Sequence, residues 1–227
     1  MNIVALHGWG HEKDSFNELK KQLESLPQVK TVYAFDLPGF GNQKLVDNKW
    51  DIPHYADWVQ AQIKRLKLKD VILIGHSFGG RIAAHIASQN PDYLEGLVLS
   101  GAPVLYRPTL KVTMKRKLFS TLKDIIPTKA KSFIFSKELK DAESRGLGAI
   151  FRKVVLFDQT KSLPKIAVPT LLIWGEYDTD VPLRIAQETH TLIPHSKLII
   201  IKGATHTSFL THPYIFFGYV KKFIESL

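Results

Sequence analysis

The chain has 227 residues, of which 44% are hydrophobic and 23% are charged, as is typical of a soluble globular protein with one sizeable core. It has no cysteine, which excludes disulfides and thiolate metal sites, and no apolar run reaches the roughly 18 residues of a membrane span. The N-terminal residues lack the basic and apolar regions of a signal peptide, so we expect a cytoplasmic protein without a transmembrane segment.

The first part of the chain alternates strand-like runs with amphipathic segments. Residues 2–8 (NIVALHG) and 31–41 (TVYAFDLPGFG) have the apolar character of strands in a parallel sheet, and Pro38 and Gly39 are expected to stop the second strand. The segment between them is predicted to be helical, with Asp14 or Ser15 as its N-cap. Its apolar residues recur at helical spacing: Phe16, Leu19, Leu23 and Leu26.

A second helix is predicted around residues 52–66, with Pro53 in its first turn. The same alternation then continues to the C-terminus. The remaining strands are predicted at 71–75, 94–101, 169–175 and 196–203. One helix is predicted at 79–88 and another from about Pro182. The last helix is predicted from four apolar residues that share one face: Phe216, Val220, Phe223 and Leu227.

Apolar strands that alternate with helices indicate an α/β protein with a mostly parallel central sheet of about six strands, covered by helices on both faces. One stretch breaks the alternation, because residues 104–163 contain no strand-like run and are much longer than an ordinary strand-to-helix connection. We predict a core domain made of residues 1–103 and 164–227, with residues 104–163 inserted as a helical lid.

The run VILIGHSFGGRIAAHIA (71–87) places Ser77 where a predicted strand meets a predicted helix. Strand and helix backbones approach closely at such a turn, and Gly75 and Gly79 leave room for that approach. The G-x-S-x-G pattern is that of a nucleophile elbow, which holds a serine hydroxyl clear of the backbone at the top of the sheet.

A serine hydroxyl needs a base to take its proton, and the base needs an acid to orient it. His206 follows the last predicted strand, and Asp178 follows the one before it. Because the carboxyl ends of parallel strands share one edge of the sheet, Ser77, Asp178 and His206 are expected to meet there as a catalytic triad.

Two other carboxylates compete with Asp178 for the role of the acid. Asp180 is two residues further on, and it is also well placed to cap the next helix. Glu176 is a weaker candidate. We favour Asp178 because it lies nearer to the end of the strand than Asp180 does.

The negative charge of an acyl-transfer intermediate needs backbone N–H donors, which form an oxyanion hole. One donor is expected from Phe78, the residue after the candidate nucleophile, and the other from Trp9 in the loop HGWG (7–10). Trp9 would also give its indole to the acyl pocket. Its alternative role is that of a core aromatic residue.

Five stretches together resemble the α/β-hydrolase fold family: LHGWG, DLPGFG, GHSFGGRIA, PTLLIWGEYDTDVP and GATHTSFL. They follow one another in the order of the family and cover nearly the whole chain except the lid. The pairing of HGWG with DLPGFG is similar to esterases that cut methyl esters of pimeloyl groups on acyl carrier protein, which recognise an acidic carrier through basic lid residues.

The resemblance implies Ser77 as the nucleophile, Asp178 as the acid, His206 as the base, and Trp9 and Phe78 as oxyanion donors that also line the substrate site. It implies an acyl-enzyme resolved by water, with no metal and no organic cofactor. Family members usually have two further N-terminal strands, so this sheet is expected to have six. Thr205 stands where the family often has glycine.

The lid segment carries most of the net charge of the chain. Residues 104–163 hold 14 Lys or Arg and 5 Asp or Glu, a balance of +9 within the total of +10. Three interpretations compete: a solvated surface, a docking face for an acidic carrier protein or substrate, and a helix that lies on an anionic lipid surface. Nucleic-acid binding is not expected, because no recognition motif accompanies the charge.

We therefore predict a serine hydrolase that cleaves a small-molecule carboxylic ester or thioester. The same triad supports hydrolysis of a C–C bond next to a ketone. A ligand-binding or receptor module with little turnover is the alternative from a different class.

Overall fold

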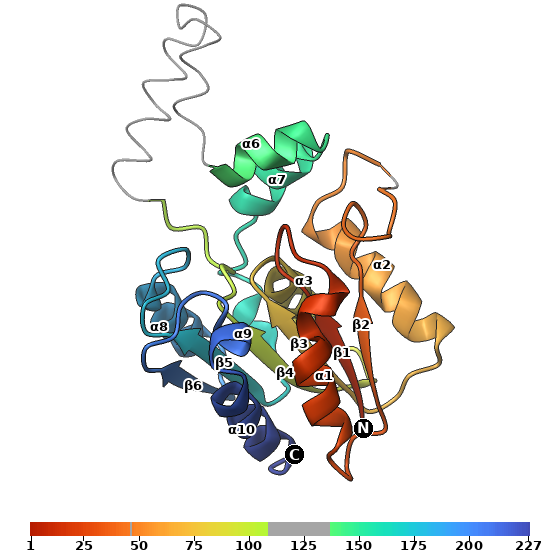
Figure 1. Ribbon diagram of the computed structural model, residues 1–227, viewed down its shortest axis with the longest axis vertical. Helices are drawn as coiled ribbons and strands as arrows, with labels where there is room; N and C mark the ends of the chain where they lie inside the picture. The colour runs from red at the N-terminus through yellow and green to blue at the C-terminus, as the bar shows by residue number, and fades with distance from the viewer. Residues whose placement is uncertain (46, 109–136) are drawn as a thin grey trace, which may run out of the picture.

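The computed structural model describes residues 1–45, 47–108 and 137–227 (Figure 1). Its centre is one six-stranded sheet in the order β2-β1-β3-β4-β5-β6, and every neighbouring pair is parallel. The prediction of an α/β fold with six strands is confirmed. The strands are β1 (Asn2–Leu6), β2 (Thr31–Phe35), β3 (Val71–His76), β4 (Leu94–Ser100), β5 (Thr170–Gly175) and β6 (Ser196–Ile201).

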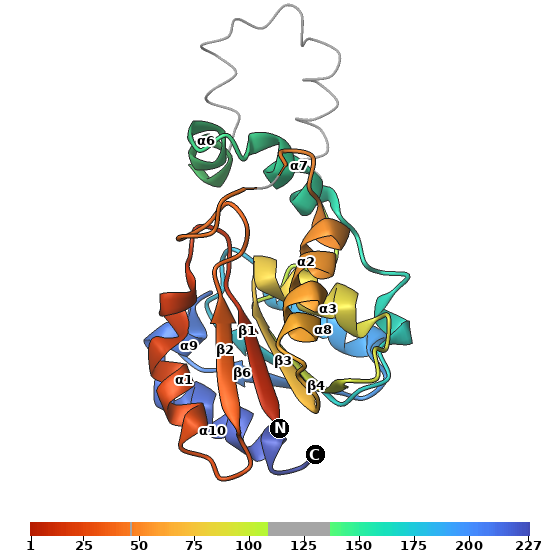
Figure 2. The ribbon, with the colours of Figure 1, turned by 90° about the vertical axis from the view of Figure 1, so that its right-hand side faces the viewer.

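Helices cover both faces of this sheet (Figure 2). One face is covered by α1 (Asn17–Glu24) and α10 (Pro213–Ile224), and the other by α2 (Ile52–Arg65), α3 (Phe78–Ala87) and α8 (Leu183–Leu192). Side chains of β3 alternate between two apolar cores: Ile72 and Ile74 belong to the core that contains α1 and α10, and Leu73 belongs to the other. Burial on both faces explains why every residue of this strand is apolar up to Gly75.

The strand register aligns the carboxyl ends of the central strands. Leu6 pairs with Gly75, which in turn pairs with Leu99, and His76 pairs with Ser100. The segments that follow β1, β3 and β4 therefore leave the sheet at one edge, as do those that follow β5 and β6. Short helical turns complete the fold: η1 (Lys13–Phe16), η2 (Leu163–Lys165) and α9 (Ser208–Thr211).

Two details of the predicted elements are wrong. The second strand, expected to stop at Pro38 and Gly39, already ends at Phe35. The next residue turns the chain out of the sheet, because the carboxylate of Asp36 accepts hydrogen bonds from Lys13 and from the backbone N–H of Asn42. Neither Asp14 nor Ser15 caps α1, since both lie in the preceding turn η1.

The second helix begins as predicted. Asp51 is the N-cap of α2, and its carboxylate accepts the backbone N–H of His54 at 3.3 Å. Pro53 lies in the first turn, where the missing N–H costs no helical hydrogen bond.

Only part of the predicted lid is described. Helices α6 (Lys137–Ser144) and α7 (Gly148–Leu156) lie above the carboxyl edge of the sheet (Figures 1 and 2). The predicted cations between Lys111 and Lys131 fall within 109–136 and lie outside the described residues. The lid boundaries at 104 and 163 therefore stay a prediction.

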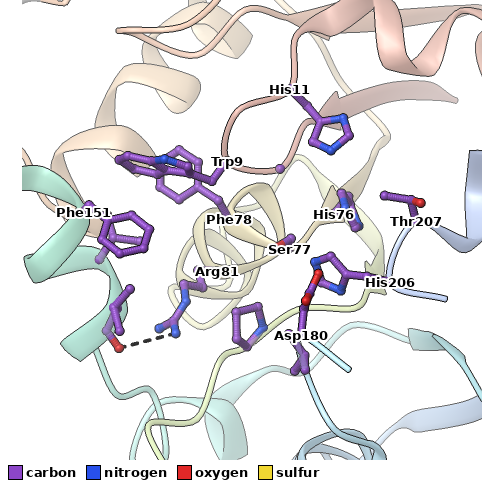
Figure 3. Close-up of a pocket in the computed structure, with 15 residues that line it drawn as sticks. Trp9, His11, His76, Ser77, Phe78, Arg81, Phe151, Asp180, His206 and Thr207 are labelled. Carbon is purple, nitrogen blue, oxygen red and sulfur yellow. Dashed lines mark hydrogen bonds between the residues drawn. The ribbon is translucent and has the colours of Figure 1, made fainter. Parts of the chain in front are cut away.

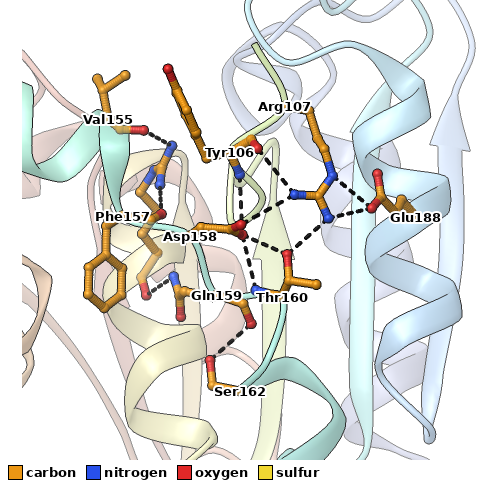
Figure 4. Close-up of polar contacts among 10 residues, drawn as sticks. Tyr106, Arg107, Val155, Phe157, Asp158, Gln159, Thr160, Ser162 and Glu188 are labelled. Atoms are coloured by element: carbon orange, nitrogen blue, oxygen red, sulfur yellow. Dashed lines mark hydrogen bonds and ion pairs between the residues drawn. The ribbon is translucent and has the colours of Figure 1, made fainter.

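Both ends of the predicted lid segment are joined to the core through Arg107 (Figure 4). Its guanidinium donates to Glu188 of α8 through Nε at 2.9 Å, to the Thr160 hydroxyl at 2.9 Å and to Asp158 at 3.4 Å. One side chain thus joins the segment that enters the lid to the segment that leaves it. Nowhere in the described parts of the chain does a helix combine the length and the apolar run needed to cross a bilayer.

Candidate active site

Ser77 occupies a strained turn between β3 and α3. Its φ of 49° and ψ of −110° lie in a region that residues with a Cβ seldom adopt. A Cβ on Gly75 would lie 2.6 Å from the carbonyl oxygen of Gly79, and a Cβ on Gly79 would overlap the carbonyl group of Leu6. Only glycine at these two positions allows the helix to start so close to the sheet.

Backbone hydrogen bonds hold this turn on both sides. The N–H of Ser77 donates to the carbonyl of Ser100 in β4 at 2.9 Å, and the N–H of Gly79 donates to the carbonyl of His7 at 3.0 Å. The conformation of Ser77 is therefore fixed by the two strands that flank β3.

His206 and Asp178 lie side by side at the carboxyl edge. The Nδ1 of His206 is 2.9 Å from Oδ2 of Asp178, whose side chain is completely buried, while the imidazole of His206 is 16% exposed. The other carboxylate oxygen of Asp178 accepts the backbone N–H groups of Val181 at 2.8 Å and Asp180 at 3.1 Å. With both oxygens engaged, the carboxylate has a fixed orientation toward Nδ1 and leaves Nε2 of His206 facing away from it.

Ser77 and His206 line the same cavity (Figure 3). No hydrogen bond joins their side chains within the described residues, although the ring of His206 lies 4.8 Å from the ring of His76, the neighbour of Ser77. Hydrogen bonds between a nucleophile and its base are often long without substrate and tighten when substrate binds. The roles of Ser77 as nucleophile and His206 as base therefore stay a prediction.

The other two predicted carboxylates lie elsewhere. Asp180 lines the cavity but does not contact His206 through a hydrogen bond, and it does not cap α8, whose N-cap is Pro182. Glu176 accepts the backbone N–H of Gly203 at 3.0 Å. The geometry distinguishes Asp178 from both.

The loop after β1 lies against the turn at Ser77. A Cβ on Gly8 would be 3.3 Å from the Cβ of Ser77, which shows how near the two backbones are. The backbone N–H groups of Trp9 and Phe78 have no hydrogen-bond partner among the residues that the structure describes. Two unpaired donors thus flank the candidate nucleophile, as an oxyanion hole requires.

His7 fixes the position of this loop. Its Nε2 accepts the backbone N–H of Leu37 at 3.0 Å, so its Nδ1 carries the proton and donates to the carbonyl of Gly8 at 2.8 Å. Burial lowers the pKa of His7 to about 4, so the ring is neutral and this tautomer persists at neutral pH.

The cavity has a volume of about 530 Å³ and two chemically different sides (Figure 3). Trp9, Phe78 and Phe151 form an aromatic side. The ring centroid of Trp9 is 5.3 Å from that of Phe78 and 5.0 Å from that of Phe151, and both pairs pack edge to face. His206 and Thr207 lie on the other side of Ser77. Trp9 thus lines the cavity, and its expected role in an acyl pocket stays a prediction.

Sequence reasoning missed Arg81 and Phe151, which also line the cavity. Arg81 lies one turn after Ser77, is 5% exposed and donates to the carbonyl of Phe157 at 2.7 Å. Burial lowers its pKa to about 10, although the charge of Asp158 opposes this shift, so the guanidinium remains charged at neutral pH. The sequence held a signal for Arg81, because it is the single Lys, Arg, Asp or Glu in the helix FGGRIAAHIA, whose other residues are mostly small or apolar.

His76 is buried beside Ser77 and its Nε2 has no partner in the described parts of the chain. Burial and the nearby His206 hold the pKa of His76 well below its usual value, so this ring is neutral. Across residues 1–45, 47–108 and 137–227, no group of three or more His, Asp or Glu side chains is arranged to hold a metal ion.

Comparison with known proteins agrees with this architecture. A family model described as "Alpha/beta hydrolase family" matches residues 3–217. Among curated proteins, a pimeloyl-[acyl-carrier protein] methyl ester esterase of Neisseria meningitidis serogroup B is 27% identical, over 98% of this chain and 92% of its own length.

Solved structures support the fold alone, because their sequence identity to this chain is low. A bromoperoxidase from Bacillus anthracis superposes with a TM-score of 0.79 at 24% identity, over 99% of this chain and 91% of that one. An esterase from Exiguobacterium antarcticum gives a TM-score of 0.77 at 24% identity, over 99% and 92% of the two chains.

Proposed function

This chain belongs to the alpha/beta hydrolase family, and from that premise we propose that it cleaves a carboxylic ester or thioester through an acyl-enzyme on Ser77. The family and the esterase relatives make it a carboxylic ester hydrolase. One observation carries the mechanism: a buried carboxylate, Asp178, is hydrogen-bonded to His206, which shares a cavity with a serine held at a strained turn.

In the first half of the reaction, Nε2 of His206 takes the proton of the Ser77 hydroxyl while Oγ attacks the carbonyl carbon of the ester. His206 then gives this proton to the departing alkoxide or thiolate, and the acyl group remains on Ser77. In the second half, His206 takes a proton from water, the hydroxide attacks the acyl carbon, and the proton returns to Oγ. The sum is ester plus water giving acid plus alcohol or thiol.

Asp178 has two roles in this proposal. Its bond to Nδ1 keeps the proton on that nitrogen, so that Nε2 is free to act as a base. Its negative charge stabilises the imidazolium that forms after each proton transfer. Trp9 and Phe78 donate their backbone N–H groups to the oxyanion, and the fixed loop means that these donors need no reorganisation during the reaction.

The test is hydrolysis of short p-nitrophenyl esters by the wild type and by Ser77→Ala. We expect the variant to lose at least about a thousandfold in kcat, because attack by the serine is removed while binding remains. A fluorophosphonate probe should label the wild type and leave Ser77→Ala unlabelled. Equal rates for the two proteins would contradict the proposal.

We also propose that the substrate is attached to an acidic carrier protein. The name of the meningococcal relative specifies an acyl carrier protein, and the predicted lid of this chain has a strong excess of cations. Its described part presents Lys140 and Lys161, both exposed. Opposite charges would raise the association rate by steering.

This second proposal predicts a salt effect that is specific to the carrier. The kcat/KM for an acyl group on acyl carrier protein should fall several-fold between 50 and 300 mM salt, because the Debye length shortens to less than about 10 Å. The kcat/KM for the same acyl group as a methyl ester should stay constant. Equal salt dependence for both substrates would contradict a carrier-binding role.

A further inference from the structure

Arg81 is a buried charge without a charged partner in contact. Asp36 and Asp178, the buried carboxylates of the described residues, each bond to a cationic or imidazole side chain. Arg81 donates only to backbone carbonyls, those of Phe157 at 2.7 Å and Val155 at 3.5 Å. Buried charges in proteins are normally paired, because an uncompensated charge is costly to remove from water.

The position of this charge relates it to the candidate nucleophile. Arg81 and Ser77 both line the cavity, and the N–H of Arg81 donates to the carbonyl of Ser77 at 3.1 Å across one turn of α3. Their Cα atoms are thus separated by about 6 Å along the helix axis. The side chain of Arg81 runs from α3 to the carbonyls of Val155 and Phe157 at the end of α7 (Figure 3), so its guanidinium lies at a different part of the cavity from the Ser77 hydroxyl.

Part of the guanidinium remains available. The two bonds to the end of α7 use Nη1 and Nη2, whereas Nε makes no hydrogen bond within the described residues. Nε and the second hydrogen on Nη2 form the parallel fork that matches the two oxygens of a carboxylate. Arg81 and Phe151 both line the cavity (Figure 3), and Phe151 belongs to its aromatic side, where we expect the acyl group to lie.

We propose that Arg81 binds a free carboxylate at the far end of the acyl group, so that the preferred substrates are half-esters or half-thioesters of short, linear dicarboxylic acids. This inference rests on the proposed function and narrows its substrate class. The bond cleaved, the water consumed and the proton transfers are those described above. Only the acyl group is specified, and the alcohol or thiol side stays free to be small or carrier-bound.

The alternative is that Arg81 serves only to anchor the end of α7. An anchor would affect every substrate equally, whereas a carboxylate-binding residue affects only substrates that carry the charge. The ratio of kcat/KM between matched charged and neutral esters therefore separates the two roles.

The experiment compares monomethyl succinate with methyl butyrate, and monomethyl glutarate with methyl valerate, so that each pair differs by a carboxylate in place of a methyl group. The wild type should prefer the charged ester of at least one pair by tenfold or more in kcat/KM. In Arg81→Met this ratio should fall at least tenfold, and in Arg81→Lys it should fall less. Arg65→Met, which removes an exposed arginine of α2, is the matched control and should keep the wild-type ratio.

The inference would be overturned if the wild type showed no preference for the charged esters. It would also be overturned if kcat/KM of Arg81→Met fell equally for both esters of a pair. Either result leaves the proposed function intact. If Arg81→Met does not fold, inhibition of methyl butyrate hydrolysis by glutarate and by glutaramide decides the question. Stronger competitive inhibition by glutarate supports the site, and equal inhibition overturns it.

If the wild type hydrolyses none of the four esters, the proposed function fails, and the inference is judged by calorimetry alone. Binding of glutarate to the wild type that weakens at least tenfold in Arg81→Met, and less in Arg81→Lys, then supports a carboxylate site. Absence of binding to the wild type overturns it.

Discussion

At the scale of single residues, Ser77 combines a functional position with local strain. Its φ of 49° and ψ of −110° are those of the first central residue of a type II′ turn, a position that favours glycine. Strain of this kind costs on the order of 1–3 kcal/mol and is tolerated where function requires it.

Replacing Ser77 by glycine should therefore stabilise the fold relative to Ser77→Ala. Glycine relieves the backbone strain but loses part of the gain through the greater freedom of the unfolded chain, so we expect a net difference of about 1 kcal/mol in the free energy of unfolding. Urea denaturation of both variants, each inactive toward esters, measures it. An alanine variant as stable as the glycine variant would show that the turn stores no strain.

His7 should make the stability of the protein depend on pH. Burial lowers its pKa from 6.5 to about 4, partly opposed by its bond to Gly8 and by the charge of Asp36. Below pH 6.5 His7 becomes protonated in the unfolded chain, whereas in the folded chain it stays neutral down to about pH 4. The free energy of unfolding thus falls as the pH drops through this window, by on the order of 3 kcal/mol for this group.

Urea titrations at several pH values test this assignment. His7→Gln should flatten the dependence between pH 6.5 and 4, while the buried His76 still contributes in the same direction. His195→Gln, an exposed position, is the control and should keep the wild-type slope. An unchanged slope in His7→Gln would mean that His7 does not resist protonation in the folded state.

At the scale of elements, replacing either of two helical glycines by alanine is expected to change the stability of the fold in opposite directions. A Cβ on Gly79 would overlap the end of β1 at Leu6, whereas a Cβ on Gly218 in α10 would meet no atom of the described residues within 4 Å. Gly79→Ala should cost about 3 kcal/mol or more of stability, and Gly218→Ala should add about 0.5–1 kcal/mol. Thermal denaturation of the pair checks both signs, and a stable Gly79→Ala would contradict the close approach of α3 and β1.

The elements that sequence predicts well are those with a strong local signal. The six strands are mostly apolar runs, and Ser77, Asp178 and His206 follow three of them, so parallel pairing alone brings these residues to one edge. The end of β2 was not predictable, because it depends on a hydrogen bond between Asp36 and Lys13, 23 residues apart. The role of Arg81 was missed for a similar reason, since its partner Phe157 belongs to a segment 76 residues away.

At the scale of the whole molecule, Arg107 connects the two ends of the lid segment with α8. Replacing it by methionine removes its bonds to Glu188, Thr160 and Asp158. We expect the backbone amides of residues 158–163 to exchange with deuterium about fivefold faster, which corresponds to about 1 kcal/mol for a partly exposed ion pair.

Hydrogen exchange followed by mass spectrometry measures this effect peptide by peptide. Arg65→Met again serves as the control, and peptides of β1 and β3 should exchange at wild-type rates in both variants. Unchanged exchange in residues 158–163 of Arg107→Met would show that other contacts, such as the bond between the Gln159 N–H and the Val104 carbonyl, suffice to hold the lid ends.

The turn at Ser77 is held by carbonyls of His7 and Ser100, and the imidazole opposite it comes from His206, close to the C-terminus. Such distant pairings form late when a chain collapses, because closing long loops is entropically costly. On the proposed mechanism, a fragment that lacks β6 or the loop after it is expected to have no activity. The return of turnover after dilution from denaturant would then report the time at which these distant segments come together.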